Sequence, residues 1–504
     1  MAEYILRAEN IKKSFGGVHA LKGVSIAIKK GEIHCLAGEN GCGKSTLIKV
    51  ISGFYTPDRG SFEIDGNAYD KITPAQAIEA GVQVIYQDLS LFPNLTVMEN
   101  LALNMELSLG RKVVSWKRFE QIAKEALSKI EVSLDLHELV ENLSVASKQL
   151  VAICRALLSN AKLIIMDEPT TALTTKEIGA LFEIIRQLQA QGISILFVSH
   201  KLDEVFEISE GYTIFRSGEN VAAGDTSELD QKKFAHYMTG KDFGDTQPLP
   251  PLESPELLMQ VQNLSLKNGF KDISFDLMKG EILGITGLLG SGRTELAQAL
   301  FGYRKADEGT VEIDGAPVAI DSVHTAMAHG IGYVPEDRLT EGLFLLQSIN
   351  RNMLVSKWDE FSNIFGFLDG KKLGQESDKW IENLSVAAKF PELPVQTLSG
   401  GNQQKVVLAR WLALRLKVLI LNGPTVGVDI GAKYDIHRII RGLSQEGMSV
   451  IMISDDLPEV VENCHRVLVM RGGRLAGGWP IGEVTTKMLA TVAVGGVENG
   501  NAAE

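Results

Sequence analysis

The chain has 504 residues, of which 45% are hydrophobic and 22% are charged, a composition typical of soluble globular proteins. Its formal charge of −13 argues against a protein built mainly to wrap nucleic acid or to coat anionic lipid. No apolar run approaches the roughly 18 residues of a membrane span, and the first residues lack the apolar core of a secretory signal. Four scattered cysteines without C-x-x-C spacing predict reduced thiols and a cytoplasmic protein.

The first half of the chain predicts strands that alternate with helices. Continuous apolar runs at residues 33–37, 163–166 and 195–198 are typical of strands in a sheet that is covered on both faces. Residues 177–192, EIGALFEIIRQLQAQG, have a helical pattern of apolar positions between two of these strands. The alternation predicts an α/β fold with a mostly parallel sheet.

A glycine-rich loop follows the first of these strands and leads into a predicted helix near Lys44. It matches the pattern G-x-x-x-x-G-K-[ST], in which backbone N–H groups surround phosphates, the lysine reaches the β and γ phosphates and the hydroxyl binds Mg²⁺. Cys42 is interpreted as a small residue that fills space, although the nearby helix N-terminus could lower its pKa. The predicted phosphate-binding residues are Gly38, Glu39, Asn40, Gly41, Cys42, Gly43, Lys44, Ser45 and Thr46.

An acidic pair ends the next strand of this half. Residues 163–166 are all apolar and are followed directly by Asp167 and Glu168. A buried strand would deliver Asp167 to the Mg²⁺ shell, with Glu168 beside it as the base for an attacking water. Acidic residues at strand ends are otherwise common, so the interpretation depends on the glycine-rich loop.

The second half of the chain repeats the first. The segment that begins at Val24 aligns with the one at Ile273, and Leu143-Ser144 aligns with Leu398-Ser399, with further strands predicted at 418–421 and 450–453. Four prolines lie between the copies. We therefore predict a first domain at 1–240, a linker at 241–256, a second domain at 257–494 and a disordered tail at 495–504.

The order of these motifs resembles that of ATP-binding cassette (ABC) ATPases, and the fused pair looks like the cytoplasmic subunit of bacterial sugar importers of the ribose and galactose type. The resemblance implies two tandem nucleotide-binding domains, each with a mostly parallel sheet, a helical subdomain and an antiparallel β part. Without it, Phe15 would be read as a core aromatic and His200 as a packed strand-end histidine. It implies that Phe15 stacks on adenine, that Gln87 serves catalysis and Mg²⁺, that His200 is catalytic, and that Ser399, Gly400, Gly401 and Gln403 belong to a signature that binds nucleotide.

Both copies depart from the family pattern. In the second copy the counterparts of Lys44, Gln87, Asp167, Glu168 and His200 are Arg293, Glu336, Asn422, Gly423 and Asp455. The first copy has an altered signature, Leu143-Ser144-Val145-Ala146, and Thr174 where the second copy keeps Asp429. The resemblance implies head-to-tail pairing, so that one composite site receives every intact part and hydrolyses ATP. The other site is then a non-hydrolysing nucleotide clamp or an empty scaffold, and both remain open.

The resemblance implies an ATPase that uses ATP and Mg²⁺ to drive import of a sugar-like solute. Its partners would be two integral membrane permease subunits and, indirectly, an extracytoplasmic solute-binding protein, with no nucleic acid. The chain would lie peripherally on the cytoplasmic face of the inner membrane, and residues 91–97 would either dock a partner helix or pack under the helical subdomain. A soluble twin-cassette ATPase acting on ribosomes or DNA and a protein that only binds ATP are the alternatives; the solute stays open.

Overall fold

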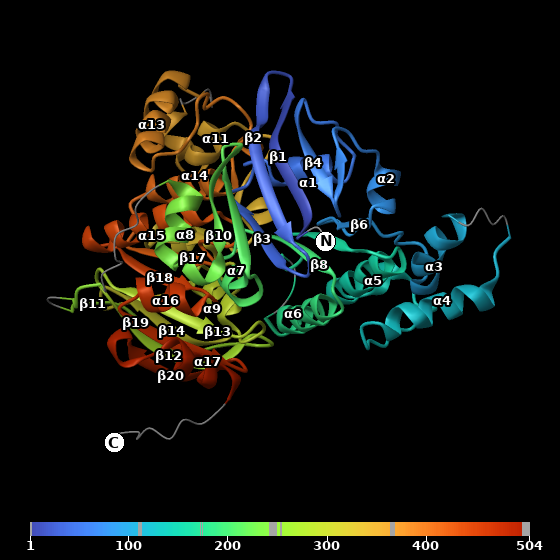
Figure 1. The fold of residues 1–504 in the computed structure, drawn as a ribbon. Coiled ribbons are helices and arrows are strands. Elements are labelled where there is room, and N and C mark those ends of the chain that lie inside the picture. Colours follow the sequence, from blue (N-terminus) through green and yellow to red (C-terminus); the bar gives the residue numbers. More distant parts are fainter. Residues whose placement is uncertain are drawn as a thin grey trace. The chain divides into compact units, whose positions relative to one another are not determined.

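The computed structural model describes residues 3–108, 113–171, 173, 175–240, 249–252, 255–362 and 368–495. The chain forms two compact units that divide between Phe243 and Gly244 (Figure 1). Much of the predicted linker, nearly all of the predicted tail, and Thr174 lie outside the described residues. Within the described part of the chain, no helix is both long and apolar enough to cross a membrane.

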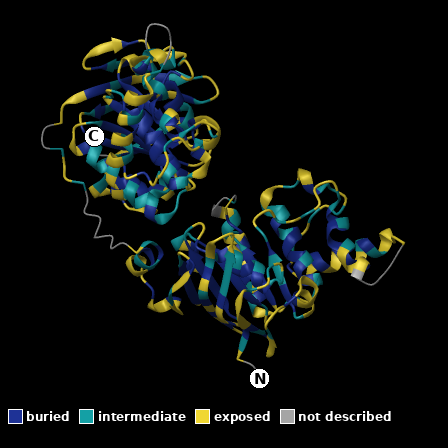
Figure 2. Cartoon of the chain, turned by 90° about the horizontal axis from the view of Figure 1, so that it is seen from above, coloured by how far each residue is buried: buried dark blue, intermediate teal, exposed yellow. Residues whose placement is uncertain are grey.

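The first unit contains a six-stranded sheet in the order β10-β9-β3-β8-β7-β6. All neighbouring strands are parallel except β9 and β10. Every residue of β3 and β8 is buried, as the continuous apolar runs predict. Buried residues gather in the interior of each unit (Figure 2). The strands are β3 (Ile33–Gly38), β6 (Val82–Ile85), β7 (Leu163–Asp167), β8 (Ser194–Ser199), β9 (Gly211–Arg216) and β10 (Glu219–Asp225).

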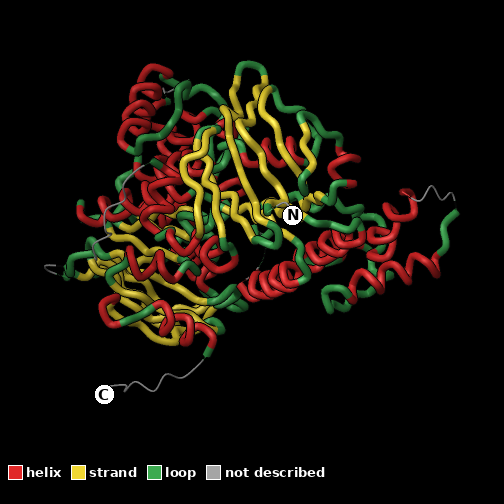
Figure 3. The backbone as a smooth tube through the Cα atoms, in the orientation of Figure 1, coloured by secondary structure: helices red, strands yellow, loops and turns green. Residues whose placement is uncertain are grey.

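An antiparallel sheet and a group of helices complete the first unit (Figure 3). The helices α3, α4 and α5 contact one another and share a hydrophobic core. The antiparallel strands are β1 (Tyr4–Phe15), β2 (Val18–Lys29), β4 (Arg59–Ile64) and β5 (Asn67–Tyr69). The helices are α1 (Lys44–Ile51), α2 (Pro74–Glu79), α3 (Val97–Ser108), α4 (Trp116–Ser128), α5 (Val145–Leu158), α6 (Thr175–Ala190), α7 (Leu202–Ile208) and α8 (Gln231–Thr239).

The second unit repeats this architecture. Its larger sheet has the order β16-β17-β18-β13-β19-β20, and its antiparallel sheet has the order β12-β11-β14-β15. The strands are β11 (Leu257–Leu266), β12 (Phe270–Met278), β13 (Ile282–Gly287), β14 (Glu308–Ile313), β15 (Ala316–Val318), β16 (Ile331–Val334), β17 (Val418–Asn422), β18 (Ser449–Ile453), β19 (Arg466–Arg471) and β20 (Arg474–Pro480).

Some helices of the second unit begin at side chains that cap them. Asp369 and Asp429 accept backbone N–H groups at the starts of α13 and α15, which satisfies donors that the helix itself leaves unpaired. The predicted fold class, two α/β cassettes each with an antiparallel part and a helical part, is confirmed. The helices are α9 (Arg293–Leu300), α10 (Val323–Ala328), α11 (Ile349–Leu354), α12 (Trp358–Phe361), α13 (Gly370–Asn383), α14 (Gly400–Leu412), α15 (Ile430–Gln445), α16 (Leu457–Asn463) and α17 (Thr486–Val494).

Candidate nucleotide-binding sites

One edge of the first unit's larger sheet collects the predicted site residues. Strands β3, β8, β7 and β6 are adjacent and parallel, so their carboxyl ends lie at the same edge. The glycine-rich loop follows β3, His200 follows β8, the acidic pair lies at the end of β7 and Gln87 follows β6. Ligands of open α/β sheets bind at this edge, and the topology therefore places these four motifs where one ligand could meet them.

The glycine-rich loop of the first unit needs its glycines. Gly41 and Gly43 have φ angles of +79° and +108°, a region that side chains disfavour. A Cβ on Gly43 would lie 2.7 Å from the carbonyl oxygen of Ala20 and 2.8 Å from Leu21 Cδ2. Gly43 directly precedes α1, so the loop delivers the chain to a helix N-terminus, which favours anions.

Lys44 lies along this loop. Its side chain is almost fully buried, and its Nζ donates to the carbonyl oxygens of Gly38 at 2.6 Å and Glu39 at 3.0 Å. The ammonium group is therefore held by the loop that would surround a phosphate. An anion at the loop would meet this positive charge together with the helix N-terminus.

Ser45 and Asp167 lie side by side. Ser45 Oγ donates to Asp167 Oδ2 at 3.4 Å. Burial, and next the charge of Glu168, raise the pKa of Asp167, while Lys44 opposes the shift. Hydroxyl and carboxylate oxygens are ligands that Mg²⁺ prefers. The described residues contain no group of three or more His, Cys, Asp or Glu side chains able to hold a metal. Water or phosphate oxygens would complete the shell of an ion bound by Ser45 and Asp167.

Glu168 has an unusual backbone conformation. Its φ angle is +48°, which for a residue other than glycine costs roughly 1–2 kcal/mol. Its N–H donates to Val198 O at 3.1 Å, and its Oε1 lies 3.1 Å from His200 Nδ1. The hydrogen bond with His200 lowers the pKa of Glu168 against the effect of burial, so the side chain is ionised at neutral pH and can accept a proton.

Phe15 lies at the end of β1 and is 40% exposed, so it is not a core aromatic. Its ring packs edge-to-face on Tyr55 with centroids 5.0 Å apart, and Lys13 Nζ lies 5.4 Å from its centroid. Gln87 is exposed in the turn after β6.

Cys42 is buried in the glycine-rich loop, and this burial raises its pKa. The suggestion of a lowered pKa at Cys42 is therefore wrong, because desolvation outweighs the charge of Lys44 and the helix N-terminus.

The second unit has a loop of the same shape with different chemistry. Gly292 has a φ angle of +95° and directly precedes α9, as Gly43 precedes α1. Arg293 is buried where the first unit has Lys44, and its Nη1 donates to Gly287 O at 2.7 Å. Its Nη2 lies 3.3 Å from Asp455 Oδ2. The counterparts of Lys44 and His200 therefore form an ion pair with each other.

The second unit also keeps the backbone of the acidic pair without its carboxylates. Gly423 has a φ angle of +60°, and its N–H donates to Ile453 O at 2.8 Å, as Glu168 donates to Val198. Asn422 is buried, and its Nδ2 donates to Thr294 Oγ1 at 3.5 Å. Glu336 is exposed after β16. The fold of the site is retained, but Gly423 supplies no general base. The side chain of Glu336 borders this position, with its Cγ 3.2 Å from where a Cβ on Gly423 would lie.

The hairpin β11–β12 lacks a counterpart of Phe15, which the sequence reasoning missed. Tyr4 pairs with Lys29 in the first unit and Leu257 pairs with Met278 in the second, so the second hairpin is shorter by four residues at its tip. The sequence does contain a sign of the shorter hairpin. The difference in residue number between the two copies is larger at Tyr4 and Leu257 than at Lys29 and Met278.

The signature glycines of the second unit are packed against their own unit. A Cβ on Gly401 would overlap Ala432 Cβ, and one on Gly400 would lie 2.7 Å from Arg338 Nη2. Ser399 directly precedes α14, and the buried Gln403 donates its Nε2 to Leu398 O at 3.1 Å. Close packing within the second unit is thus in itself a reason for glycine at both positions.

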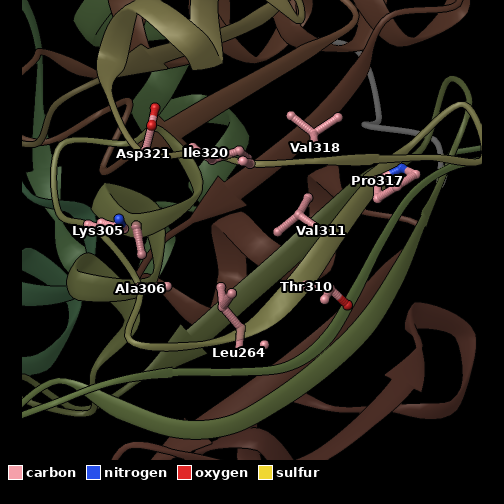
Figure 4. A pocket seen from close by; sticks show the side chains of 12 residues that line it. Leu264, Lys305, Ala306, Thr310, Val311, Pro317, Val318, Ile320 and Asp321 are labelled. Atoms are coloured by element: carbon pink, nitrogen blue, oxygen red, sulfur yellow. The ribbon is translucent and has the colours of Figure 1, made fainter.

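A groove of about 460 Å³ in the second unit lies apart from these motifs (Figure 4). Leu264, Thr310 and Val311 line it from β11 and β14, and Lys305, Ile320 and Asp321 line it from connecting segments. Residues 287–294 do not line the groove, so we assign it no part in phosphate binding.

A glycine-rich loop between a strand and a helix, with an acidic pair on a buried strand of the same sheet, defines a phosphate-loop nucleotide-binding protein of the α/β class. The chain belongs to the ABC transporter family, whose profile matches residues 21–171 and 270–426. The predicted family is therefore confirmed.

The chain is similar over nearly its whole length to three bacterial proteins. It is 39% identical over 491 residues to the ribose import ATP-binding protein RbsA of Bacillus subtilis (strain 168), covering 97% of this chain and 99% of the relative. It is 42% identical over 491 residues to ribose import ATP-binding protein RbsA 1 of Agrobacterium fabrum, covering 97% and 96%. It is 40% identical over 496 residues to a putative ribose/galactose/methyl galactoside import ATP-binding protein of Pseudomonas syringae pv. syringae, covering 98% and 94%.

Among solved structures, the chain is similar to the ADP conformation of an ATP-binding cassette of an ABC transporter. The identity is 31% and the TM-score is 0.42, with 47% of this chain and 99% of that chain covered.

Proposed function

We propose that this chain is the ATP-hydrolysing subunit of an ABC importer and powers uptake of a sugar or sugar-like solute through separate membrane subunits. The observation that carries the chemistry is the sheet edge of the first unit, where Glu168 and His200 lie beside the glycine-rich loop. The solute class follows from the full-length relatives named as ribose or galactose import proteins, which also disfavour the ribosome or DNA alternative. Magnesium-dependent ATP hydrolysis by the purified chain tests the proposal against a protein that only binds ATP.

Each residue of the first site has a proposed task. Phe15 stacks on adenine, the loop residues 38–46 and the ammonium of Lys44 bind the phosphates, and Gln87 lies beside the attacking water. Ser45, Asp167 and Gln87 hold Mg²⁺, which when bound supplies charge neutralisation at the phosphates. Glu168 accepts the proton of the attacking water, and His200 holds that carboxylate in its ionised form through the 3.1 Å hydrogen bond.

We propose that the two nucleotide sites are unequal. The intact loop, acidic pair and histidine belong to the first copy, whereas the intact signature Ser399-Gly400-Gly401, with Gln403, belongs to the second. Head-to-tail pairing would unite these parts in one hydrolytic site. The second site would combine Arg293 and Gly423 with the altered signature at Val145 and would not hydrolyse ATP.

A bulky substitution in each signature tests this pairing. Ser399→Arg is expected to lower the ATPase rate at least about a hundredfold, because the side chain would occupy the position of the γ-phosphate in the hydrolytic site. Ser144→Arg is the matched control in the first copy, where Ser144 caps α5 and accepts the N–H of Ser147. It is expected to leave most of the ATPase rate intact. A larger loss in Ser144→Arg than in Ser399→Arg would contradict head-to-tail pairing.

We propose two membrane permease subunits as direct partners and an extracytoplasmic solute-binding protein as an indirect one, with the chain peripheral on the cytoplasmic side. The segment after Gln87 suits this contact, since Phe92, Pro93 and Asn94 are exposed. Asn100 fixes the segment by accepting the N–H of Phe92 at 2.9 Å and donating to its carbonyl at 3.0 Å. Asn352 makes the same two bonds to Phe344 in the second unit. Each fixed loop thus holds one exposed aromatic side chain, Phe92 or Phe344, that a partner helix could cover.

Cysteine cross-linking tests the proposed docking segments. Single cysteines at Asn94 and at Leu346, next to Leu345, are expected to cross-link to cytoplasmic loops of the membrane subunits in the assembled transporter. The four native cysteines are buried, so they need not be removed. A cysteine at the exposed Ile78 on α2 is the control and is expected to give no cross-link. Cross-links only to soluble proteins, or co-purification with ribosomes, would contradict the importer assignment.

A further inference from the structure

A second buried carboxylate, Glu204 of α7, lies behind the pair Glu168–His200. The residue is 5% exposed, and both of its carboxylate oxygens are hydrogen-bonded. Glu204 Oε1 accepts from Thr170 Oγ1 at 2.5 Å, and Oε2 accepts from Ser199 Oγ at 2.6 Å. The Nζ of Lys201 lies 2.9 Å from Oε1. One side chain therefore joins the turn after β7 to the end of β8, two segments that are 29 residues apart in sequence, counting from Thr170 to Ser199.

These two segments carry the groups that are proposed to perform hydrolysis. Thr170 is two residues beyond Glu168, and Ser199 directly precedes His200. Ser199 Oγ also accepts the N–H of Lys201 at 3.0 Å, so the hydroxyl that donates to Glu204 shapes the turn at His200 itself. A shift of either segment would change the 3.1 Å separation between Glu168 Oε1 and His200 Nδ1.

The backbone conformation of Glu168 also needs to be held by its neighbours. Its φ angle of +48° is sparsely populated for residues with a side chain, and such conformations persist only where the surroundings determine them. On one side, the backbone N–H of Glu168 is held by its hydrogen bond to the carbonyl oxygen of Val198. On the other side, Thr170 is fixed by Glu204, so the conformation of the short segment between them is defined at both ends.

The second unit contains the same network around a site without a base. Glu459 of α16 accepts from Thr425 Oγ1 at 2.6 Å and from Ser454 Oγ. Thr425 is two residues beyond Gly423, which adopts its positive φ angle without a side chain to strain it. The two hydroxyl bonds are thus common to both cassettes. Glu459 differs in that its Oε1 also lies 2.7 Å from Nε2 of the buried His437, and only in the first unit do the bonded segments lead to a carboxylate and a histidine at the proposed hydrolytic site.

We propose that Glu204 is a positioning residue for hydrolysis, which holds Glu168 and His200 in register by fixing the two segments that carry them. The inference rests on the proposed role of Glu168 as the base. Glu204 itself touches neither nucleotide nor water in this account and acts through Thr170 and Ser199.

The matched pair Glu204→Gln and Glu459→Gln tests the inference in the full chain. An amide keeps one acceptor oxygen and replaces the other by an NH2 donor. One of the two hydroxyls must then accept from the amide instead of donating to a charged oxygen, which weakens the hold on that segment in either variant. Glu204→Gln is expected to lower kcat about ten- to a hundredfold with KM for ATP within about twofold of the parent, since positioning within a fraction of an ångström governs the reaction rather than binding. Glu459→Gln is expected to change kcat less than about twofold, because its site lacks the base.

Thr170 supplies a second test that does not depend on the folding of Glu204→Gln. Thr170→Val keeps the shape and removes the hydroxyl, and is expected to lower kcat as Glu204→Gln does. Thr170→Ser keeps the hydroxyl and is expected to rescue kcat to within about threefold of the parent. Equal kcat in Glu204→Gln and Glu459→Gln, or equal kcat in the two Thr170 variants, would overturn the inference. Glu168→Gln measured in parallel separates the two proposals, because retained turnover in that variant would refute the base instead.

Discussion

Glu168→Gln is expected to abolish steady-state ATP hydrolysis, with turnover lowered at least about a hundredfold, while ATP binding survives. The amide has nearly the shape of the carboxylate, but it cannot take a proton from the attacking water. The parent carboxylate is ionised at neutral pH, since the hydrogen bond with His200 lowers its pKa against the effect of burial, and it therefore has a free oxygen lone pair for that proton. Phosphate release measures the turnover, and retention of labelled ATP measures the binding.

The control for this variant is Glu336→Gln in the second unit. Glu336 is exposed after β16, beside a site whose acidic pair is replaced by Asn422 and Gly423, so this change from acid to amide is expected to leave turnover unaltered. Turnover of Glu168→Gln within tenfold of the parent would show that another group accepts the proton.

Lys44→Ala is expected to be as severe as Glu168→Gln, whereas Arg293→Ala should cost much less hydrolysis. Lys44 supplies the positive charge that would lie beside the phosphates in the proposed hydrolytic site. Loss of this charge should lower turnover about a hundredfold or more. Arg293 is already engaged with Gly287 O and with Asp455 in a site proposed to perform no chemistry. The measurement is the ATPase rate of both variants at saturating ATP.

Arg293→Lys is the companion variant. It restores the usual lysine of the motif to the second loop and is expected to add no hydrolysis, because Asn422 and Gly423 still supply no carboxylate. Equal losses in Lys44→Ala and Arg293→Ala, or a gain of turnover in Arg293→Lys, would contradict a single hydrolytic site.

Sequence alone predicted the parts of the site that are local. The glycine-rich loop and the pair Asp167–Glu168 are short patterns in which residue type is dictated by backbone shape or by a ligand, so each is recognisable without its neighbours. The α/β fold was equally accessible, because continuous apolar runs require a sheet covered on both faces and the repeat supplied each motif twice.

The remainder depends on contacts between distant segments. The burial that raises the pKa of Cys42 comes from the surrounding fold and is not encoded in the loop itself. The contact between Gly401 and Ala432 joins the starts of α14 and α15. The positive φ angle of Glu168 and the bonds of Glu204 to Thr170 and Ser199 have no local signature, because their cause is tertiary packing. Only three-dimensional placement shows them.

The central claim, one hydrolytic site in each chain, is tested most directly by counting the ADP that orthovanadate traps on the assembled transporter after incubation with magnesium and ATP. Vanadate arrests a site after it has cleaved ATP, so the count reports how many sites perform hydrolysis. We predict about one trapped ADP per chain, lost in Glu168→Gln and retained in Arg293→Ala. Two trapped ADP per chain, or one that survives in Glu168→Gln, would contradict the claim.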